Sequence, residues 1–340
     1  MASHPWVWII VLNWNGLADT LACLESLRRL RYEHHRVVVV DNGSTDGSVE
    51  ALRGRAAELE IELIDAGRNL GYAGGNNVGI RRALDGGADF ILVLNNDTVV
   101  DPGLLDELLA AAERNPTAGC FGPWILYLSD PERIWFSGSA WDADAGAFTA
   151  RGKGKLASEL SADGVDTAYV CGAALFVRAR VPREIGLFDE RFFLVYEDSD
   201  WCFRARRAGW SCMMVPGARV WHRIGTSFGS EASPLRTYFS TRNKLLWAEK
   251  NARGSEWRRA LYRAVRRLVP RVAVERRSGT PAHKALLWAC ASFGRDWSIK
   301  CHNSQEIAQR RAVADYLARR FGDCPPRIRA LTQGWTGVGN

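Results

Sequence analysis

Residues 36–48 read RVVVVDNGSTDGS, four consecutive valines followed by a turn rich in Asp, Gly and Ser. A β-branched run of this kind predicts a strand over residues 36–41 that is covered on both faces. Asp46 can then cap a helix that continues to about Ala57. A buried strand that leads into a helix is typical of an α/β protein built on a parallel sheet.

The neighbouring sequence repeats this alternation of strands and helices. Residues 7–12 read VWIIVL and predict a second buried strand, and leucines at helical spacing predict a helix over 17–30. Further elements are expected as strand 61–64, helix 76–84 and strand 89–94. The alternation predicts a mostly parallel, Rossmann-like sheet with helices on both faces. Ligands of such sheets bind outside the carboxyl ends of the strands, so we expect the chemistry there.

The pattern changes after Pro102. The expected elements are a helix over 103–114, aromatic-rich segments with hairpin-like turns to about Val177, a helix that follows Asp198 and continues to about Ala208, a strand over 211–215, a loop over 223–234, helices to about Phe321 and an irregular end over 325–340. This order predicts two regions. A catalytic domain covers residues 1–227, and a mostly helical, basic C-terminal extension covers residues 228–340.

The composition of the 340 residues is that of an ordinary globular protein, with 47% hydrophobic and 24% charged residues, which excludes disordered and fibrous classes. No apolar run approaches the roughly 18 residues of a membrane-spanning helix. The first residues lack the features of a secretory signal, which predicts a cytoplasmic protein.

The eight cysteines include no C-x-x-C pair, so we expect reduced, mostly buried thiols. A zinc site on Cys301 and His302 is the alternative.

The charge is unevenly distributed along the chain. The formal net charge is +7, but after Ser227 there are 22 Lys and Arg against 8 Asp and Glu, and before it 23 against 30. In residues 256–269 apolar side chains recur at helical spacing and arginines occupy the remaining positions. Such a helix can lie on an anionic membrane surface, or it can pack its apolar stripe on the protein and expose its arginines to water.

Polar side chains come directly after each strand predicted in the first hundred residues. They form four clusters, which are Asn13-Trp14-Asn15-Gly16, the turn at 41–46, the glycine-rich segment 68–77 and Asn95-Asn96-Asp97-Thr98. One Asp after a strand is usually only a turn residue. Four such clusters meet at one edge of a parallel sheet, which predicts a binding site at that edge.

The sequence motifs occur in a fixed order, namely VLNWNG, VDNGSTDGS, NLGYAGGNN, LNNDT, CGAALFVR, LFDERFFLVYEDSDWCFRARRAGW and VWH. This ordered set runs from about residue 7 to about residue 250. It resembles the inverting glycosyltransferases of family 2, and especially their bacterial rhamnosyltransferase-like members. The resemblance implies a GT-A fold, with a nucleotide-binding half over 1–100 and an acceptor-binding half over 101–227.

A nucleotide-sugar donor needs groups that recognise its base and ribose and that hold its diphosphate. Asp41 can accept from a pyrimidine N–H or a ribose hydroxyl, a role that the resemblance also implies. Arg68 and the amides of the glycine-rich turn can hold diphosphate oxygens. This turn lacks the G-x-G-x-x-G spacing of dinucleotide-binding oxidoreductases. The residues expected at the donor are Asn13, Asn15, Asp41, Asn42, Ser44, Arg68, Asn69, Gly71, Gly74, Asn76, Asn96 and Gly172.

Asn95-Asn96-Asp97 occupies the position of the family's Asp-x-Asp metal motif, although two of its three residues are Asn. The resemblance implies that Asp97 binds Mg²⁺ or Mn²⁺, hard cations that prefer oxygen ligands. His222 resembles the histidine that completes the metal shell in several relatives, and an imidazole favours Mn²⁺. A satisfied structural histidine is the alternative.

The pair Glu197-Asp198 matches the family's catalytic acids. The resemblance implies that Asp198 is the general base that removes the acceptor proton, with Glu197 in a supporting or acceptor-binding role. Asp198 also precedes a predicted helix and can act as its N-cap, and Asp200 is a weaker alternative for the base. Trp201 and Trp221 flank these acids and the histidine, and each can either stack on a sugar or pack in the core.

The sequence therefore predicts a metal-dependent inverting glycosyltransferase. Its favoured donor is dTDP-rhamnose, followed by UDP- and GDP-sugars, and its acceptor is a hydroxyl of a glycan or a lipid-linked saccharide in cell-wall or O-antigen synthesis. A natural product or a protein is the alternative acceptor, and a non-catalytic nucleotide-sugar-binding module is the alternative function. A nucleotidyltransferase is disfavoured because VLNWNG has no basic residue. We expect peripheral membrane association through the basic C-terminal helices, a homodimer and no nucleic-acid partner.

Overall fold

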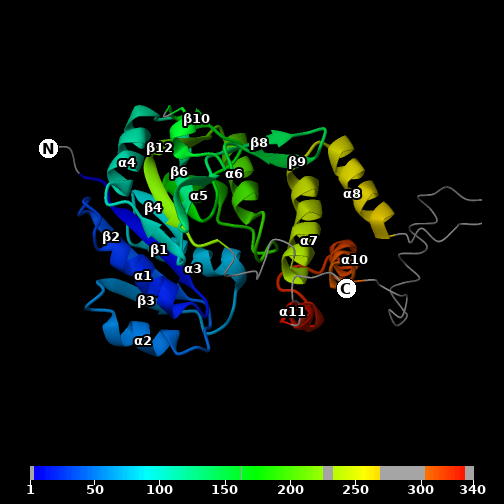
Figure 1. The fold of residues 1–340 in the computed structure, drawn as a ribbon, viewed down its shortest axis with the longest axis horizontal. Helices are drawn as coiled ribbons and strands as arrows, with labels where there is room; N and C mark the ends of the chain where they lie inside the picture. Colours follow the sequence, from blue (N-terminus) through cyan, green and yellow to red (C-terminus); the bar gives the residue numbers. More distant parts are fainter. Residues whose placement is uncertain (1–3, 162, 225–232, 269–302, 334–340) are drawn as a thin grey trace, which may run out of the picture. The chain divides into compact units, whose positions relative to one another are not determined.

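The structure is a computed structural model that describes residues 4–161, 163–224, 233–268 and 303–333. By its internal contacts the chain divides into two compact units. One unit comprises residues 1–142 and 147–224, and the other comprises residues 143–146 and 225–340 (Figure 1). No helix among the described residues is long and apolar enough to span a membrane.

The first unit is built on one mixed sheet. Its strands are β1 Val7–Asn13, β2 His35–Asp41, β3 Ile61–Asp65, β4 Phe90–Asn95, β5 Thr98–Val100, β6 Ala118–Tyr127, β7 Asp130–Phe136, β10 Val165–Asp166, β11 Ala174–Arg178 and β12 Ser211–His222. The order is β10-β12-β6-β11-β4-β1-β2-β3, with β5 paired to β12 and β7 to β6. The β4-β1-β2-β3 pairings and the β12-β6 pairing are parallel, whereas β11 runs antiparallel to both of its neighbours. The predicted mostly parallel α/β sheet is confirmed.

Helices cover both faces of this sheet. They are α1 Leu17–Leu27, α2 Ser48–Arg55, α3 Gly71–Asp85, α4 Leu104–Arg114, α5 Arg180–Ile185 and α6 Glu197–Arg207. The apolar side chains of α1, α2 and α4 pack with Val7, Ile9 and Val11 on one face, while those of α3, α5 and α6 pack with Trp8 and Ile10 on the other. This division results from the alternation of side chains along a strand.

Several predicted boundaries differ from the structure. The first helix ends at Leu27 instead of 30, and the strand predicted over 211–215 continues to His222. The predicted hairpins are present as β6–β7 and as β8 Ser139–Asp142 paired with β9 Ala147–Ala150, beside a short helix η1 Ala157–Glu159. Asp46 precedes the N-cap Gly47, and its carboxylate accepts from the backbone N–H of Ser48 at 3.1 Å.

The largest difference concerns the glycine-rich segment. Helix α3 begins at Gly71 and not at residue 76, so most of the predicted turn is helical. The glycines in this helix allow close packing on the sheet. A Cβ at Gly75 would lie 2.5 Å from a methyl of Leu12, and one at Gly79 would collide with a methyl of Ile10. These glycines let the helix axis approach β1 more closely than any other residue would allow.

The second unit contains α7 Pro234–Asn251, α8 Gly254–Leu268, α10 Ser304–Leu317 and α11 Pro326–Gln333. Helix α11 lies in the segment that was predicted to be irregular. Arg242 of α7 is fully buried and donates to the carbonyl of Gly322 at 2.7 Å, and Tyr238 donates to Asp315 at 2.9 Å. The alternative zinc ligands Cys301 and His302 lie outside the described residues.

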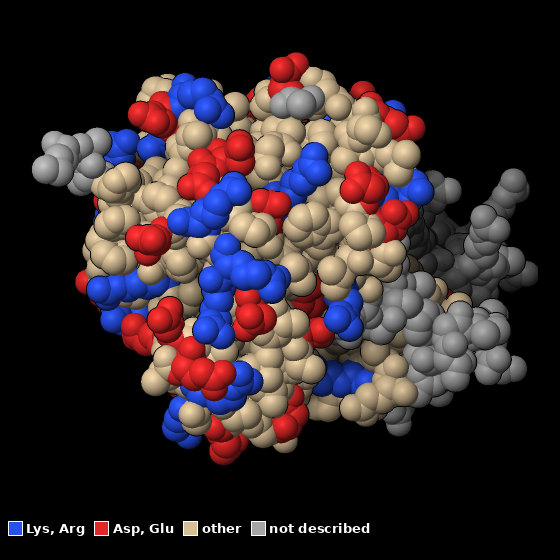
Figure 2. Space-filling model, turned by 60° about the vertical axis from the view of Figure 1, so that its left-hand side comes forward, with Lys and Arg blue, Asp and Glu red and all other residues tan. Residues whose placement is uncertain are grey.

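The surface of the molecule carries charges of both signs. On the face drawn in Figure 2, Lys and Arg side chains alternate with Asp and Glu, and neither sign forms one continuous field.

Candidate active site

The carboxyl ends of β1 and β2 bring together the first two predicted clusters. Asn13 is the register partner of Asp41, and its amide donates to the Asp41 carboxylate at 2.7 Å. The other Asp41 oxygen accepts from the backbone N–H of Ser44 at 2.8 Å. The Ser44 hydroxyl accepts in turn from the backbone N–H of Asn15 at 2.9 Å. Asp41 is fully buried, and these hydrogen bonds hold the turns that come after both strands.

The turn after β2 is joined to the loop after β3. The Asn42 side chain donates to Asn69 at 3.2 Å and accepts from the backbone N–H of Leu70 at 2.9 Å. Gly43 adopts φ +75°, and a Cβ there would lie 2.6 Å from the backbone of Arg68. The Arg68 side chain itself is exposed, and no described residue forms an ion pair or hydrogen bond with it. Arg68 is therefore available to an anionic ligand.

The remaining predicted donor residues of this region lie on α3. Gly71 is its first residue, with φ +73°, and its N–H donates to the Asn69 side chain at 2.8 Å. Gly74 and Asn76 lie within the helix instead of in an open turn, and a Cβ at Gly74 would lie 2.8 Å from the Leu70 side chain. Asn76 is fully buried and donates to the carbonyl of Tyr72 at 2.9 Å.

Asp97 and His222 are brought together by strand pairing. Strand β5 runs antiparallel to β12 with Thr98 opposite His222, so Asp97 lies beside the end of β12. The Asp97 Oδ1 atom is 2.9 Å from Nε2 of His222, and both residues are buried. Two ligand atoms at about 2.1 Å from one octahedral ion lie about 3 Å apart. The spacing therefore fits a divalent cation held by both side chains, and it also fits an ion pair with a protonated histidine.

The two asparagines before Asp97 point to different neighbours. The Asn95 amide is 3.4 Å from Nε2 of His222, which places Asn95 beside the Asp97–His222 pair. The Asn96 amide donates to the Thr20 hydroxyl at 2.9 Å, and Thr20 donates to Asn13 at 2.8 Å. Asn96 thus connects the end of β4 to α1 and, through Thr20, to Asn13 at the end of β1.

Asp198 lies in the first turn of α6 and is held by two backbone amides. Its Oδ2 atom accepts from the N–H of Gly172 at 2.9 Å, and its Oδ1 atom accepts from the N–H of Ser199 at 2.6 Å. The helix begins two residues earlier than predicted, with Tyr196 as its N-cap, so Asp198 is not the cap. Burial raises the pKa of Asp198 from its ordinary 3.8 to about 6, and the Gly172 amide opposes that rise.

Glu197 is more deeply buried than Asp198. Its pKa lies well above the ordinary value, first because of burial and second because of the neighbouring Asp198 charge. Its Oε2 atom has no hydrogen-bond partner among the residues that the structure describes. Burial therefore disfavours the charged form of Glu197 more strongly than that of Asp198, which makes Asp198 the better candidate for a proton acceptor.

Tyr72 is a site residue that the sequence analysis missed. Its hydroxyl donates to the carbonyl of Gly172 at 2.5 Å, and a Cβ at Gly172 would lie 2.8 Å from that hydroxyl. Burial and then the charges of Glu197, Asp198 and, more weakly, Asp97 raise the pKa of Tyr72 well above its ordinary value. Tyr72 lies within the NLGYAGGNN motif, so only its position in that motif could have indicated it.

Two neighbouring residues are structural. Trp201 is fully buried and donates to the carbonyl of Gly186 at 2.7 Å, so it packs in the core and does not stack on a sugar. The Asn77 side chain donates to the carbonyl of Phe188 and accepts from its N–H, both at 3.0 Å. Asn77 thereby anchors the segment that leads to α6.

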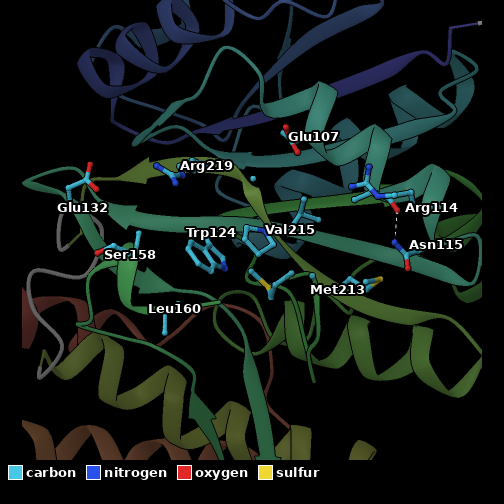
Figure 3. A pocket seen from close by; sticks show the side chains of 16 residues that line it. Glu107, Arg114, Asn115, Trp124, Glu132, Ser158, Leu160, Met213, Val215 and Arg219 are labelled. Atoms are coloured by element: carbon cyan, nitrogen blue, oxygen red, sulfur yellow. Dashed lines mark hydrogen bonds between the residues drawn. The ribbon is translucent and has the colours of Figure 1, made fainter. Parts of the chain in front are cut away.

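A cavity of about 820 Å³ lies elsewhere in this unit, between α4, β6, β12 and η1. Figure 3 shows Glu107, Trp124, Val215 and Arg219 around it. None of the predicted site residues lines this cavity. The predicted residues lie instead at the carboxyl ends of β1, β2, β4 and β12, in the loop after β3 and on the adjoining helices α3 and α6.

Comparison with known proteins identifies relatives for most of this unit. Residues 8–180, about half of the chain, match the family model described as glycosyl transferase family 2. The N-acetylglucosaminyl-diphospho-decaprenol L-rhamnosyltransferase of Mycobacterium tuberculosis is 32% identical over 244 residues, which are 67% of this chain and 78% of that protein. The dTDP-rhamnosyl transferase RfbF of Shigella flexneri is 25% identical over 257 residues, 72% of this chain and 80% of that protein.

Solved structures share the fold at low sequence identity. A mannosyltransferase from Pyrobaculum calidifontis, solved with GDP-Man and Mn²⁺, superposes with a TM-score of 0.55 at 14% identity and covers 94% of this chain and 89% of its own. GalNAc-T7, solved with UDP, GalNAc and Mn²⁺, gives a TM-score of 0.60 at 14% identity and covers 79% of this chain, which spans about half (51%) of that protein. The GT-A fold is confirmed. The family match and the mycobacterial relative together establish that this chain belongs to glycosyl transferase family 2 and is a glycosyltransferase.

Proposed function

We propose that the enzyme is a metal-dependent inverting glycosyltransferase that moves rhamnose from dTDP-rhamnose to a hydroxyl of a lipid-linked saccharide. The observation that carries the proposal is the pair of groups at one edge of the sheet. One is Asp198, a carboxylate with a pKa of about 6, and the other is the Asp97–His222 pair with its ligand atoms 2.9 Å apart.

Asp198 would act as the general base. It removes the proton of the acceptor hydroxyl while that oxygen forms a bond to the anomeric carbon, and the bond to the nucleoside diphosphate breaks on the opposite face. Attack from the opposite face inverts the anomeric configuration. A base with a pKa of about 6 is ionised at neutral pH and still retains affinity for a proton. The Gly172 and Ser199 amides hold the carboxylate in place.

Asp97 and His222 would hold the metal ion. Their 2.9 Å separation fits two ligands of one cation, and water and diphosphate oxygens would complete its shell. A divalent cation, with Mn²⁺ favoured by the imidazole, would neutralise charge on the leaving diphosphate. His222 binds a cation only as the neutral imidazole, so metal binding would weaken at acidic pH.

The donor would lie over the ends of β1, β2 and β4. Asp41, held by Asn13 and Ser44, shapes the wall for the base and ribose, and exposed Arg68 would pair with the diphosphate. The names of two relatives support rhamnose, since one is a dTDP-rhamnosyl transferase and the other an L-rhamnosyltransferase. The mycobacterial relative is named for a diphospho-decaprenol acceptor, which supports a lipid-linked saccharide here.

Such an acceptor would bring the enzyme to a membrane, and α8 offers a surface for it. Trp257 and Leu261 are half-buried, and Trp257 donates to the Tyr316 hydroxyl of α10 at 2.9 Å, so Trp257 packs within its own unit. Arg258, Arg259 and Arg263 are exposed. We expect these arginines to bind anionic lipid headgroups by charge. Replacing all three with Gln should reduce flotation with phosphatidylglycerol vesicles, and unchanged flotation would exclude this surface.

Thermal unfolding in the presence of dTDP-rhamnose, UDP-glucose and GDP-mannose, each with and without Mn²⁺, tests the donor proposal. A ligand at a hundred times its Kd stabilises the fold by about 2.7 kcal/mol. We expect a metal-dependent shift with dTDP-rhamnose that Asp97→Ala abolishes and Asp198→Asn retains. A shift with another nucleotide would overturn the donor assignment. A shift without turnover on any lipid-linked acceptor would favour a non-catalytic binding module.

A further inference from the structure

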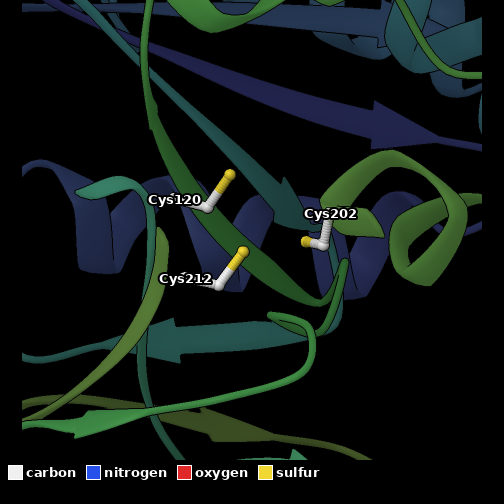
Figure 4. A group of neighbouring side chains, drawn as sticks. All are labelled: Cys120, Cys202 and Cys212. Carbon is white, nitrogen blue, oxygen red and sulfur yellow. The ribbon is translucent and has the colours of Figure 1, made fainter. Parts of the chain in front are cut away.

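Three cysteine side chains meet in the core of the first unit. Cys120 of β6 and Cys212 of β12 are register partners in neighbouring parallel strands, so their side chains lie on the same face of the sheet. Helix α6 covers that face and contributes Cys202. All three residues are fully buried, and their sulfur atoms lie within 4.8 Å of one another. Figure 4 shows the Cys202 sulfur pointing from the helix toward the two strand thiols.

The surroundings of the three sulfurs are apolar. They belong to the same core layer as Val170, Leu175, Val177 and Ala205. The Cys202 sulfur accepts from the N–H of Val170 at 3.4 Å.

We propose that Cys120, Cys202 and Cys212 form a binding site for one soft, thiol-preferring cation. Metal–sulfur bonds are about 2.3 Å long, so three sulfurs in a plane around one ion lie about 4 Å apart. The observed spacing reaches this geometry with shifts of less than about 1 Å. Each cysteine that becomes a thiolate ligand releases one proton to solvent.

The ligand set favours Cu⁺ over Zn²⁺. Structural zinc sites are nearly always tetrahedral with four protein ligands. Among the described residues no fourth histidine, cysteine or carboxylate joins the three sulfurs. Thiolates select Cu⁺ and Zn²⁺ over the hard cations that would bind at Asp97 and His222. The proposed soft-metal site is therefore chemically distinct from the donor metal site.

Metal analysis of the full chain tests the site. Protein is purified under reducing conditions from cells grown with added copper or zinc, and its metal content is measured by mass spectrometry. We expect close to one ion per chain. Cys202→Ala and Cys212→Ala should each retain at least ~10-fold less metal, because loss even of a group that only hydrogen-bonds to a ligand weakens metal binding 10- to 100-fold. Cys324→Ala, which removes a buried thiol of the second unit, should retain the wild-type content.

X-ray absorption spectroscopy of the wild-type protein keeps the test decisive if a variant fails to fold. Three sulfur neighbours and no nitrogen or oxygen in the first shell would support the site. The copper and zinc cultures distinguish the two ions. No bound ion in the wild-type chain, a shell of nitrogen and oxygen, or equal metal content in Cys202→Ala would overturn the proposal. The three thiols would then be packing groups only.

Discussion

The Asp198→Asn variant should become more stable relative to the wild-type protein as the pH rises. The pKa of Asp198 is about 6 in the folded protein and 3.8 ordinarily, so the folded state binds more protons than the unfolded chain between these values. Stability therefore falls as pH rises through this window. The ionised carboxylate costs the fold about 1.5 kcal/mol at pH 5 and about 3 kcal/mol at pH 8.

The asparagine variant avoids this cost but loses one hydrogen bond. Its single carbonyl can accept from Gly172 or Ser199 but not from both, which costs about 1–3 kcal/mol at every pH. The free energy of unfolding of the variant, relative to wild type, should therefore rise by about 1.5 kcal/mol between pH 5 and pH 8. Transfer activity should fall by at least about 100-fold at both.

Urea denaturation followed by tryptophan fluorescence at pH 5, 6, 7 and 8 measures the difference. The same comparison in a Glu197→Gln background is the control, because it removes the neighbouring titrating group and should leave the trend in place. A difference that does not change with pH, or that falls as pH rises, would refute the assignment of the raised pKa to Asp198. Wild-type activity that did not decline below pH 6 would refute its role as the base.

Three further changes test the site and its support. Arg68→Gln should raise the KM for the donor several-fold without changing the unfolding temperature, because the side chain is exposed; an unchanged KM would exclude it from the diphosphate site. Tyr72→Phe, which removes the 2.5 Å bond to Gly172, should lower kcat more than donor affinity, and a change confined to KM would contradict this positioning role. Gly79→Ala should destabilise the fold by about 1–3 kcal/mol through collision with Ile10. In contrast, Gly54→Ala on α2, where a Cβ meets nothing within 4 Å, should be neutral or stabilising in the same urea experiment.

Much of the fold could be predicted from residues close together in the sequence. The valine run at 37–40 and the apolar run at 7–12 identified β2 and β1, because a strand buried on both faces has no polar alternation. The carboxyl ends of parallel strands meet at one edge of the sheet. A contact between the polar residues that follow β1 and β2, such as that of Asn13 with Asp41, was therefore predictable. The family resemblance indicated Asp97, His222 and Asp198, but their chemical roles remain predictions.

Contacts between distant segments decided the rest. The glycines of α3 suggest a loop by local propensity, yet they lie in a helix, and glycine is required at Gly75 and Gly79 because β1 leaves no room there for a side chain. The hydrogen bonds of Tyr72 and Asp198 to Gly172 join three segments that lie far apart in the sequence. No local sequence pattern indicates that these segments are close in space. The sequence by itself determined which strands form and which polar clusters stand at their carboxyl ends, since both depend on near neighbours. Only the tertiary structure decided the burial that raises the pKa of Asp198 and the meeting of Cys120, Cys202 and Cys212, because both depend on the packing of α6 against the sheet.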